Sequence, residues 1–161
     1  MGLTALMALA FRPEDEASIV ALLNDEGGDE EWDKILSQPD FNLIREDHYE
    51  AHRVLEMLAR DHPDLAALGT IVIGKRPVAE AGMGVQYAFC AEDIRLFATA
   101  YAQVSSDQLM QAIEAVQPEF AHLQDVGIEP IAEWMPRKFD AIRQEMQKVA
   151  DANLAMIAGM T

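Results

Sequence analysis

Short apolar runs alternate with longer amphipathic stretches along the chain, a pattern typical of an α/β protein. Four of the apolar runs have the length and the composition of buried strands. They lie at residues 3–11, 70–73, 85–89 and 154–157. A last helical turn is the alternative for residues 154–157, but residues 151–153 have the composition of a helix stop, so we favour a strand.

The amphipathic stretches predict five or six helices, because apolar side chains recur every three or four residues. A capping box, Ser105-x-x-Gln108, opens one of them, and Pro118 predicts a kink or a second helix within the same run. Residues 41–44 are interpreted as the lead-in to the second helix, and Pro136 as the start of the last. The predicted helices cover residues 13–23, 45–60, 91–104, 105–123 and 136–149.

The stretch from residue 69 to residue 104 is the part around which the rest of the chain is organised. It predicts a strand with Ile71 and Ile73 buried, then a loop, a second strand and a helix. The loop, residues 74–84, has three glycines, one proline and no apolar period. Such a unit places a loop over the end of a sheet, where α/β proteins commonly bind ligands.

Length and composition fit one globular domain over residues 1–161, with 50% apolar residues. The single cysteine forms no disulfide within the chain, which suits a reducing cytosol. The apolar run at residues 3–11 has no Lys or Arg before it and is short for a signal peptide, and no segment is long enough to span a bilayer. We therefore expect a cytoplasmic protein.

The charge balance is strongly acidic, with 28 Asp and Glu against 12 Lys and Arg and a net charge of −16. A surface of this sign repels phosphate backbones and anionic membranes, so we expect neither nucleic acid nor a membrane as a partner. It favours a basic protein partner and speeds the encounter with it. Solubility alone is the simpler interpretation of the same charge.

Acidic side chains are concentrated near the N-terminus, where residues 14–33 contain nine Asp or Glu and no Lys or Arg. A solvated face, a cation site and a contact for a basic partner all fit this stretch, although it does not match the EF-hand calcium pattern. Trp32 stands within it, either as a lid on the core or as the anchor of an interface. The candidate partner contact is Asp29, Glu30, Glu31, Trp32 and Asp33.

Motifs for metal and nucleotide binding are incomplete. His48 and His52 have the spacing of a helical zinc pair, but Glu50 is one position away from the place that the His-Glu-x-x-His pattern requires. The run from Gly69 to Lys75 approaches a phosphate-binding loop, but Arg76 stands where Ser or Thr is needed to hold magnesium. We therefore expect no metal and no cofactor.

Cys90 is the remaining candidate for covalent chemistry. It stands at the start of a predicted helix, a position that favours a thiolate, but Glu92 and Asp93 oppose one. We interpret Cys90 as structural and expect no catalytic residue.

A set of short motifs spread over nearly the whole chain matches a known family. They are Asp29-x-x-Trp32-Asp33, residues 68–74, the run from Tyr87 to Ile94 before a helix, Ile128-x-Pro130-x-x-x-Trp134, and the closing apolar strand. In these motifs the chain resembles the YfbM-like family of small bacterial proteins, a domain of unknown function. The resemblance implies a three-layer α/β/α sandwich, in which five or six helices surround a small mixed sheet of about four strands.

Two functional hypotheses follow from these observations. The first is a non-enzymatic acidic interaction protein of the immunity or antitoxin kind, which binds and neutralises a basic partner toxin through the residues around Trp32. The alternative is a small-ligand-binding protein or an enzyme, with a pocket at the glycine loop made by Gly82, Gly84, Tyr87 and Trp134. Salt separates the two, because it weakens capture by charge more than it weakens binding in a buried pocket.

Overall fold

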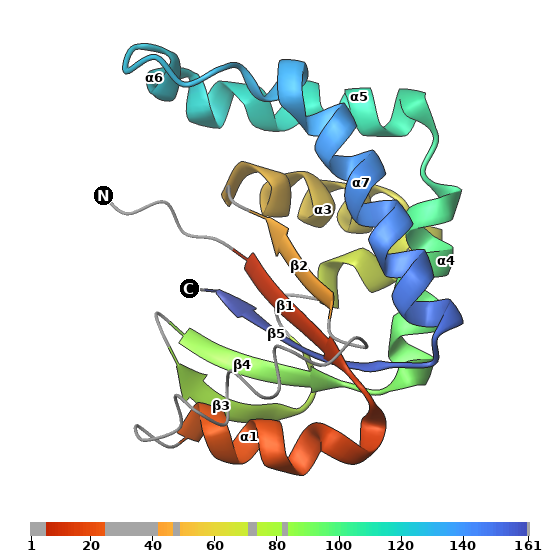
Figure 1. The fold of residues 1–161 in the computed structure, drawn as a ribbon. Helices are drawn as coiled ribbons and strands as arrows, with labels where there is room; N and C mark the ends of the chain where they lie inside the picture. Colours follow the sequence, from red (N-terminus) through yellow and green to blue (C-terminus); the bar gives the residue numbers. More distant parts are fainter. Residues whose placement is uncertain (1–5, 25–41, 47–48, 71–73, 82–83, 161) are drawn as a thin grey trace.

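The computed structural model describes most of the chain, and its strands form a single five-stranded sheet (Figure 1). The described residues are 6–24, 42–46, 49–70, 74–81 and 84–160. The strands are β1 (Leu6–Phe11), β2 (Asn42–Glu46), β3 (Pro77–Ala81), β4 (Gly84–Phe89) and β5 (Ala155–Met160). Their order across the sheet is β2-β1-β5-β4-β3, so the first and the last strand of the chain lie side by side at its centre.

Each described strand pair is antiparallel. β1 pairs with β5 along its whole length, from Leu6 opposite Met160 to Phe11 opposite Ala155. β3 forms one edge of the sheet and pairs with β4 across a register shift between Pro77 and Ala79. An edge position suits a strand that begins with proline, because the missing N–H breaks no ladder bond inside the sheet.

Helices cover both faces of the sheet, which gives three layers. α1 (Glu16–Asn24) lies on one face, and the other α-helices of the described residues lie on the opposite face (Figure 1). These are α3 (Tyr49–Asp61), α4 (Ala91–Gln103), α5 (Ser106–Val116), α6 (Ala121–Gln124) and α7 (Ile131–Asp151). Three 3₁₀ helices also occur in the described residues, namely η1 (Pro13–Asp15), η2 (Pro63–Thr70) and η3 (Gln117–Phe120).

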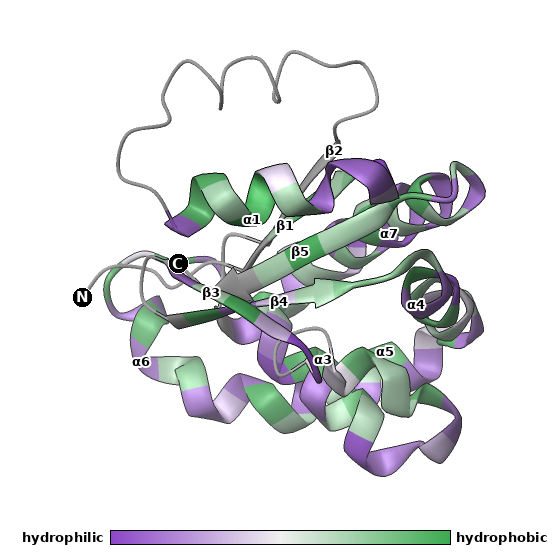
Figure 2. Cartoon of the chain, turned by 90° about the horizontal axis from the view of Figure 1, so that it is seen from below, coloured by the Kyte–Doolittle hydropathy of each residue, from purple (hydrophilic) through white to green (hydrophobic). Residues whose placement is uncertain are grey.

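The two faces of the sheet belong to two separate hydrophobic cores, because successive side chains of a strand point to opposite sides. In β1, Ala8 and Ala10 join the large core with α3, α4, α5 and α7. Phe11 and Leu9 join the smaller core with Ile19 of α1. A strand that contributes to both cores is apolar on both faces, and in Figure 2 β5 is coloured as hydrophobic over most of its length. The helices α3 and α5 instead mix hydrophobic and hydrophilic residues.

The expected α/β class and the three-layer arrangement are confirmed. The strands predicted near both ends of the chain and at residues 85–89 form, and so do the capping box of α5 and the break at Pro118. The described sheet has five strands where about four were expected, and each of its pairings is antiparallel where a mixed sheet was expected. Residues 71–73 lie outside the described residues, so the strand with Ile71 and Ile73 buried stays a prediction, while Thr70 ends η2.

Three local predictions are wrong. β2 forms at Asn42–Glu46, where only a lead-in to a helix was predicted, and β3 forms inside the predicted glycine loop. α7 begins at Ile131, five residues before Pro136, which therefore lies inside the helix and does not start it. The Pro130 carbonyl accepts the first backbone bond, from the Glu133 N–H at 2.9 Å, and the burial of Met135 and other side chains along α7 outweighs the bond that Pro136 cannot donate.

Candidate functional site

The acidic contact predicted from the sequence lies outside the described residues. Asp29, Glu30, Glu31, Trp32 and Asp33 all belong to residues 25–41, so their role as a partner surface stays a prediction. Gly82 of the alternative pocket and His48 of the predicted histidine pair also lie outside the described residues.

The surface is acidic because Asp and Glu outnumber Lys and Arg by 28 to 12, and several of the described basic side chains are held in ion pairs. Arg76 holds Glu16 with Nη1 to Oε1 at 2.6 Å, and this pairing raises the pKa of the guanidinium. Exposed carboxylates such as Glu80 and Glu92 have no such partner in the part of the chain that the structure describes. The basic side chains in ion pairs are Arg12, Arg53, Arg60, Arg76, Arg143 and Lys148.

The turn between α6 and α7 combines carboxylates with exposed apolar surface. α6 ends in a Schellman motif, in which Gly127 N–H bonds the Gln124 carbonyl at 3.1 Å and Ile128 N–H bonds the Leu123 carbonyl at 3.1 Å. Gly127 takes a φ of 83°, a left-handed value that favours glycine. The reversal leaves Val126 with 73% of its surface exposed.

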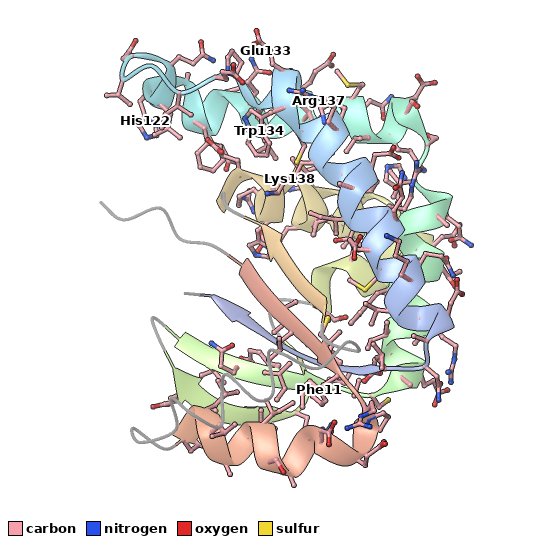
Figure 3. All side chains as sticks on the ribbon, viewed as in Figure 1. Phe11, His122, Glu133, Trp134, Arg137 and Lys138 are labelled. Atoms are coloured by element: carbon pink, nitrogen blue, oxygen red, sulfur yellow. The ribbon has the colours of Figure 1, made fainter. Side chains whose placement is uncertain are left out.

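Trp134 lies beside this turn, on the N-terminal half of α7 (Figure 3). Its side chain is half-buried and packs against the large core. It lines a hollow of about 470 Å³ together with Ile128, Glu129, Arg137 and Lys138. We use the name α6–α7 patch for Asp125, Val126, Glu129, Glu133 and Trp134.

The described residues of the alternative pocket come from two elements, β4 and α7. Gly84 starts β4, and Tyr87 stands in the middle of the same strand, half-buried against the large core. Trp134 is on α7, and neither Gly84 nor Tyr87 is among the residues that line its hollow. The small-ligand pocket at the glycine loop therefore stays a prediction.

A second hollow, of about 530 Å³, lies between η2 and the N-terminal half of α4, and we call it the η2–α4 hollow. Its apolar lining comes from Ala66, Ala67, Ala88, Phe89, Leu96 and Phe97. Its polar lining comes from Thr70, Lys75, Arg76, Cys90 and Asp93.

Gly74 brings the cationic residues to this hollow. A Cβ at residue 74 would lie 2.8 Å from Phe89 Cζ and 2.8 Å from Tyr87 Cβ, so only glycine lets the backbone come this close to β4. Just after it, the Arg76 carbonyl accepts a bond from the Ala88 N–H at 2.9 Å. The chain is thus held against the end of β4, with Lys75 and Arg76 at the mouth of the hollow.

Cys90 precedes α4 at the edge of the same hollow and is exposed. Asp93 accepts hydrogen bonds from the Cys90 backbone N–H at 3.0 Å and from the Cys90 Sγ at 3.3 Å. These are the contacts of a helix cap, which agrees with the structural role predicted for Cys90.

A buried histidine forms the centre of a charged network on α3. His52 Nε2 donates to Glu56 Oε1 at 2.8 Å, and Arg53 bonds Glu56 and, at 3.0 Å, Glu119 of η3. Burial lowers the pKa of His52 from its ordinary 6.5, and the neighbouring Glu56 offsets part of that effect. The Arg53 guanidinium lowers the pKa of Glu119. Within the described ranges, no three His, Cys, Asp or Glu side chains are grouped as metal ligands would be.

Sequence reasoning missed Val126 and Lys75 as surface features. Gly127, which shapes the turn after α6, is the signal in the sequence that a residue before it stands exposed. Lys75 was considered only as part of an incomplete phosphate-binding loop, and its place in this hollow could not be predicted because its neighbours there come from η2 and α4.

The comparison with solved structures supports the fold, and none of the comparisons with known proteins bears on activity. No family model matches the chain, and no curated protein matches it. The solved structure of YfbM, a protein of unknown function from Escherichia coli, is similar to this chain with a TM-score of 0.52 and 11% identity, over 96% of this chain and 98% of that one. The resemblance to YfbM inferred from the sequence motifs is therefore confirmed, at the level of the fold. Among the described helices, none is both long and apolar enough to cross a bilayer.

Proposed function

We propose that this protein is a non-enzymatic, cytoplasmic interaction protein that binds and neutralises a basic protein partner, as immunity proteins and antitoxins do. The observation that carries the proposal is the α6–α7 patch, which combines the exposed Val126, the half-buried Trp134 and the carboxylates of Asp125, Glu129 and Glu133, with Arg137 and Lys138 lining the same hollow as Trp134. An aromatic anchor within a charged rim is the arrangement that dominates the energetics of many protein interfaces.

The charge of the whole chain supports the same proposal. A net charge of −16 attracts a basic partner over a longer range than any single contact does, and most described arginines and lysines are already occupied by internal ion pairs. The residues from Asp29 to Asp33, with Trp32 among them, combine the same types of side chain and form a second candidate contact.

The test begins with capture of the partner from the native cells at low salt, followed by binding kinetics with the two purified proteins. Rim charges govern the encounter, so Glu129→Lys with Glu133→Lys is expected to slow association and to reduce its dependence on salt. An anchor governs the lifetime of the complex, so Trp134→Ala is expected to cost about 2 kcal/mol, which corresponds to dissociation about 30-fold faster.

Two matched controls keep the result specific. Glu80→Lys with Glu92→Lys makes the same change in net charge on β3 and α4, outside the patch, and is expected to slow association less. Glu30→Lys with Glu31→Lys makes the same change in net charge at the contact predicted from the sequence. If only this last pair slows association, the partner binds around Trp32 and not at the α6–α7 patch. Binding that is indifferent to salt and to all three charge reversals would refute the proposed function, and thermal melts exclude unfolding as the cause of any loss.

A further inference from the structure

The η2–α4 hollow has the size and the lining of a small-molecule site. Its volume of about 530 Å³ falls within the range of roughly 300–1,000 Å³ that such sites occupy. It lies where β4 passes into α4.

One side of the hollow is apolar and rigid. Phe89 and Phe97 are buried and meet edge to face, with ring centroids 5.2 Å apart and an interplanar angle of 73°. Leu96 is 58% exposed in the same hollow, although leucine normally gains by burial. A ligand with a hydrocarbon body would cover Leu96 and rest on the phenylalanine rings.

The other side of the hollow holds one cation with no carboxylate bound to it. Glu16 is already bonded to both terminal nitrogens of Arg76, at 2.6 Å and 3.1 Å. Asp93 accepts hydrogen bonds from the N–H and the thiol of Cys90, which are neutral donors, so its carboxylate keeps its negative charge but is not bound to Lys75. Lys75 is exposed, and within the described residues it has no ion pair.

We propose that the η2–α4 hollow binds a small monoanionic carboxylate with an apolar body, the carboxylate at Lys75 and the body against Leu96, Phe89 and Phe97. A single negative charge matches the single unpaired ammonium group. A polyanion would meet stronger repulsion from the net charge of −16. This site is separate from the α6–α7 patch, so its test needs no protein partner and does not depend on the function proposed above.

The experiment measures binding of octanoate to the purified protein by titration calorimetry, beside octylammonium and octan-1-ol as ligands with the same body and a different head group. We expect saturable binding of octanoate, at least tenfold weaker binding of octylammonium, and an intermediate affinity for the alcohol. Lys75→Met should weaken the binding of octanoate about tenfold and leave the binding of the alcohol nearly unchanged, because the substitution removes only the partner of the carboxylate.

Two further variants separate the hollow from the general charge of the protein. Lys148→Met removes the same charge from the exposed surface of α7 and is expected to leave octanoate binding unchanged. Ala66→Phe fills the hollow from an exposed position on η2 and should abolish binding of both octanoate and the alcohol, and the smaller Ala66→Leu repeats this test if the first variant melts early. The proposal is overturned by any one of three results: no saturable octanoate binding, octylammonium binding as tight as octanoate, or octanoate binding that survives the filling of the hollow.

Discussion

Replacing Gly74 by alanine tests how closely the chain must approach β4 to present Lys75 and Arg76. The new methyl carbon would lie 2.8 Å from both Phe89 Cζ and Tyr87 Cβ, whereas non-bonded carbon atoms prefer about 3.5–4.0 Å. Neither neighbour yields easily, because Tyr87 Cβ is the stem of a strand residue and the Phe89 ring is buried against Phe97. The segment would therefore have to move away by about 1 Å.

The expected change in the free energy of unfolding is the sum of two opposing terms. Overpacking of this kind costs about 1–3 kcal/mol, and the loss of freedom that alanine imposes on the unfolded chain returns about 0.4–1 kcal/mol. We expect a net loss of about 1.5 kcal/mol in the free energy of unfolding, or about 3–6 °C in melting temperature for a domain of this size. Urea denaturation with linear extrapolation measures the first quantity, and a thermal melt measures the second.

Gly69→Ala is the matched control for this substitution. Its Cβ would meet only the Ala59 Cβ, at 3.1 Å, within the 3₁₀ helix η2, so we expect a change well under 1 kcal/mol. The reasoning is refuted if Gly74→Ala unfolds no more easily than Gly69→Ala. It is also refuted if Gly74→Ala loses stability and yet binds octanoate as the unchanged protein does, because the displaced Lys75 should weaken that binding.

Three further substitutions have defined outcomes. His52 has a lowered pKa in the folded protein, so it contributes stability above pH 6.5 that is lost as the pH falls below that value, and urea unfolding between pH 7.5 and 5.5 should show a shallower loss for His52→Gln than for the unchanged protein. Ser105 accepts a bond from the Gln108 N–H at 3.1 Å, so Ser105→Ala should cost about 1 kcal/mol of unfolding free energy, and an unchanged urea midpoint would contradict this. Cys90→Ser replaces the thiol by a hydroxyl that can still donate to Asp93, so stability and partner binding should both persist. Loss of binding in a folded variant would instead give the thiol a functional role.

The elements that the sequence predicted correctly are those specified by neighbouring residues. The helix after Ser105 carries its own capping box, and β4 is a compact run of apolar and aromatic residues. β3 has the sequence PVAEA, which contains one β-branched residue and no aromatic one, so only its pairing with β4 makes it a strand. Ile44 of β2 fits the apolar period of the helix that follows, which concealed the strand.

The candidate sites also differ in whether neighbouring residues or tertiary packing specify them. Glu133 and Trp134 are adjacent in the sequence, and their shared place on the α6–α7 patch follows from one helix. The η2–α4 hollow instead joins Ala66, Lys75 and Phe97, which stand on separate elements, and the tertiary packing that brings them together has no signature in any one stretch of sequence.

The central position of β5 governs how the sheet can assemble during synthesis. The ribosome makes β1 to β4 first, and among the described strands only β5 joins β1 to β4. Until β5 emerges, the nascent chain can hold two strand pairs, β2–β1 and β4–β3, and in each pair the edge that β5 later covers is open to pairing with another chain. The β1–β5 pairing also closes a loop of nearly the whole chain, and contacts between such distant residues slow folding. The closing step therefore comes last, and until it is complete the edges of β1 and β4 that β5 later covers are exposed to aggregation with other chains.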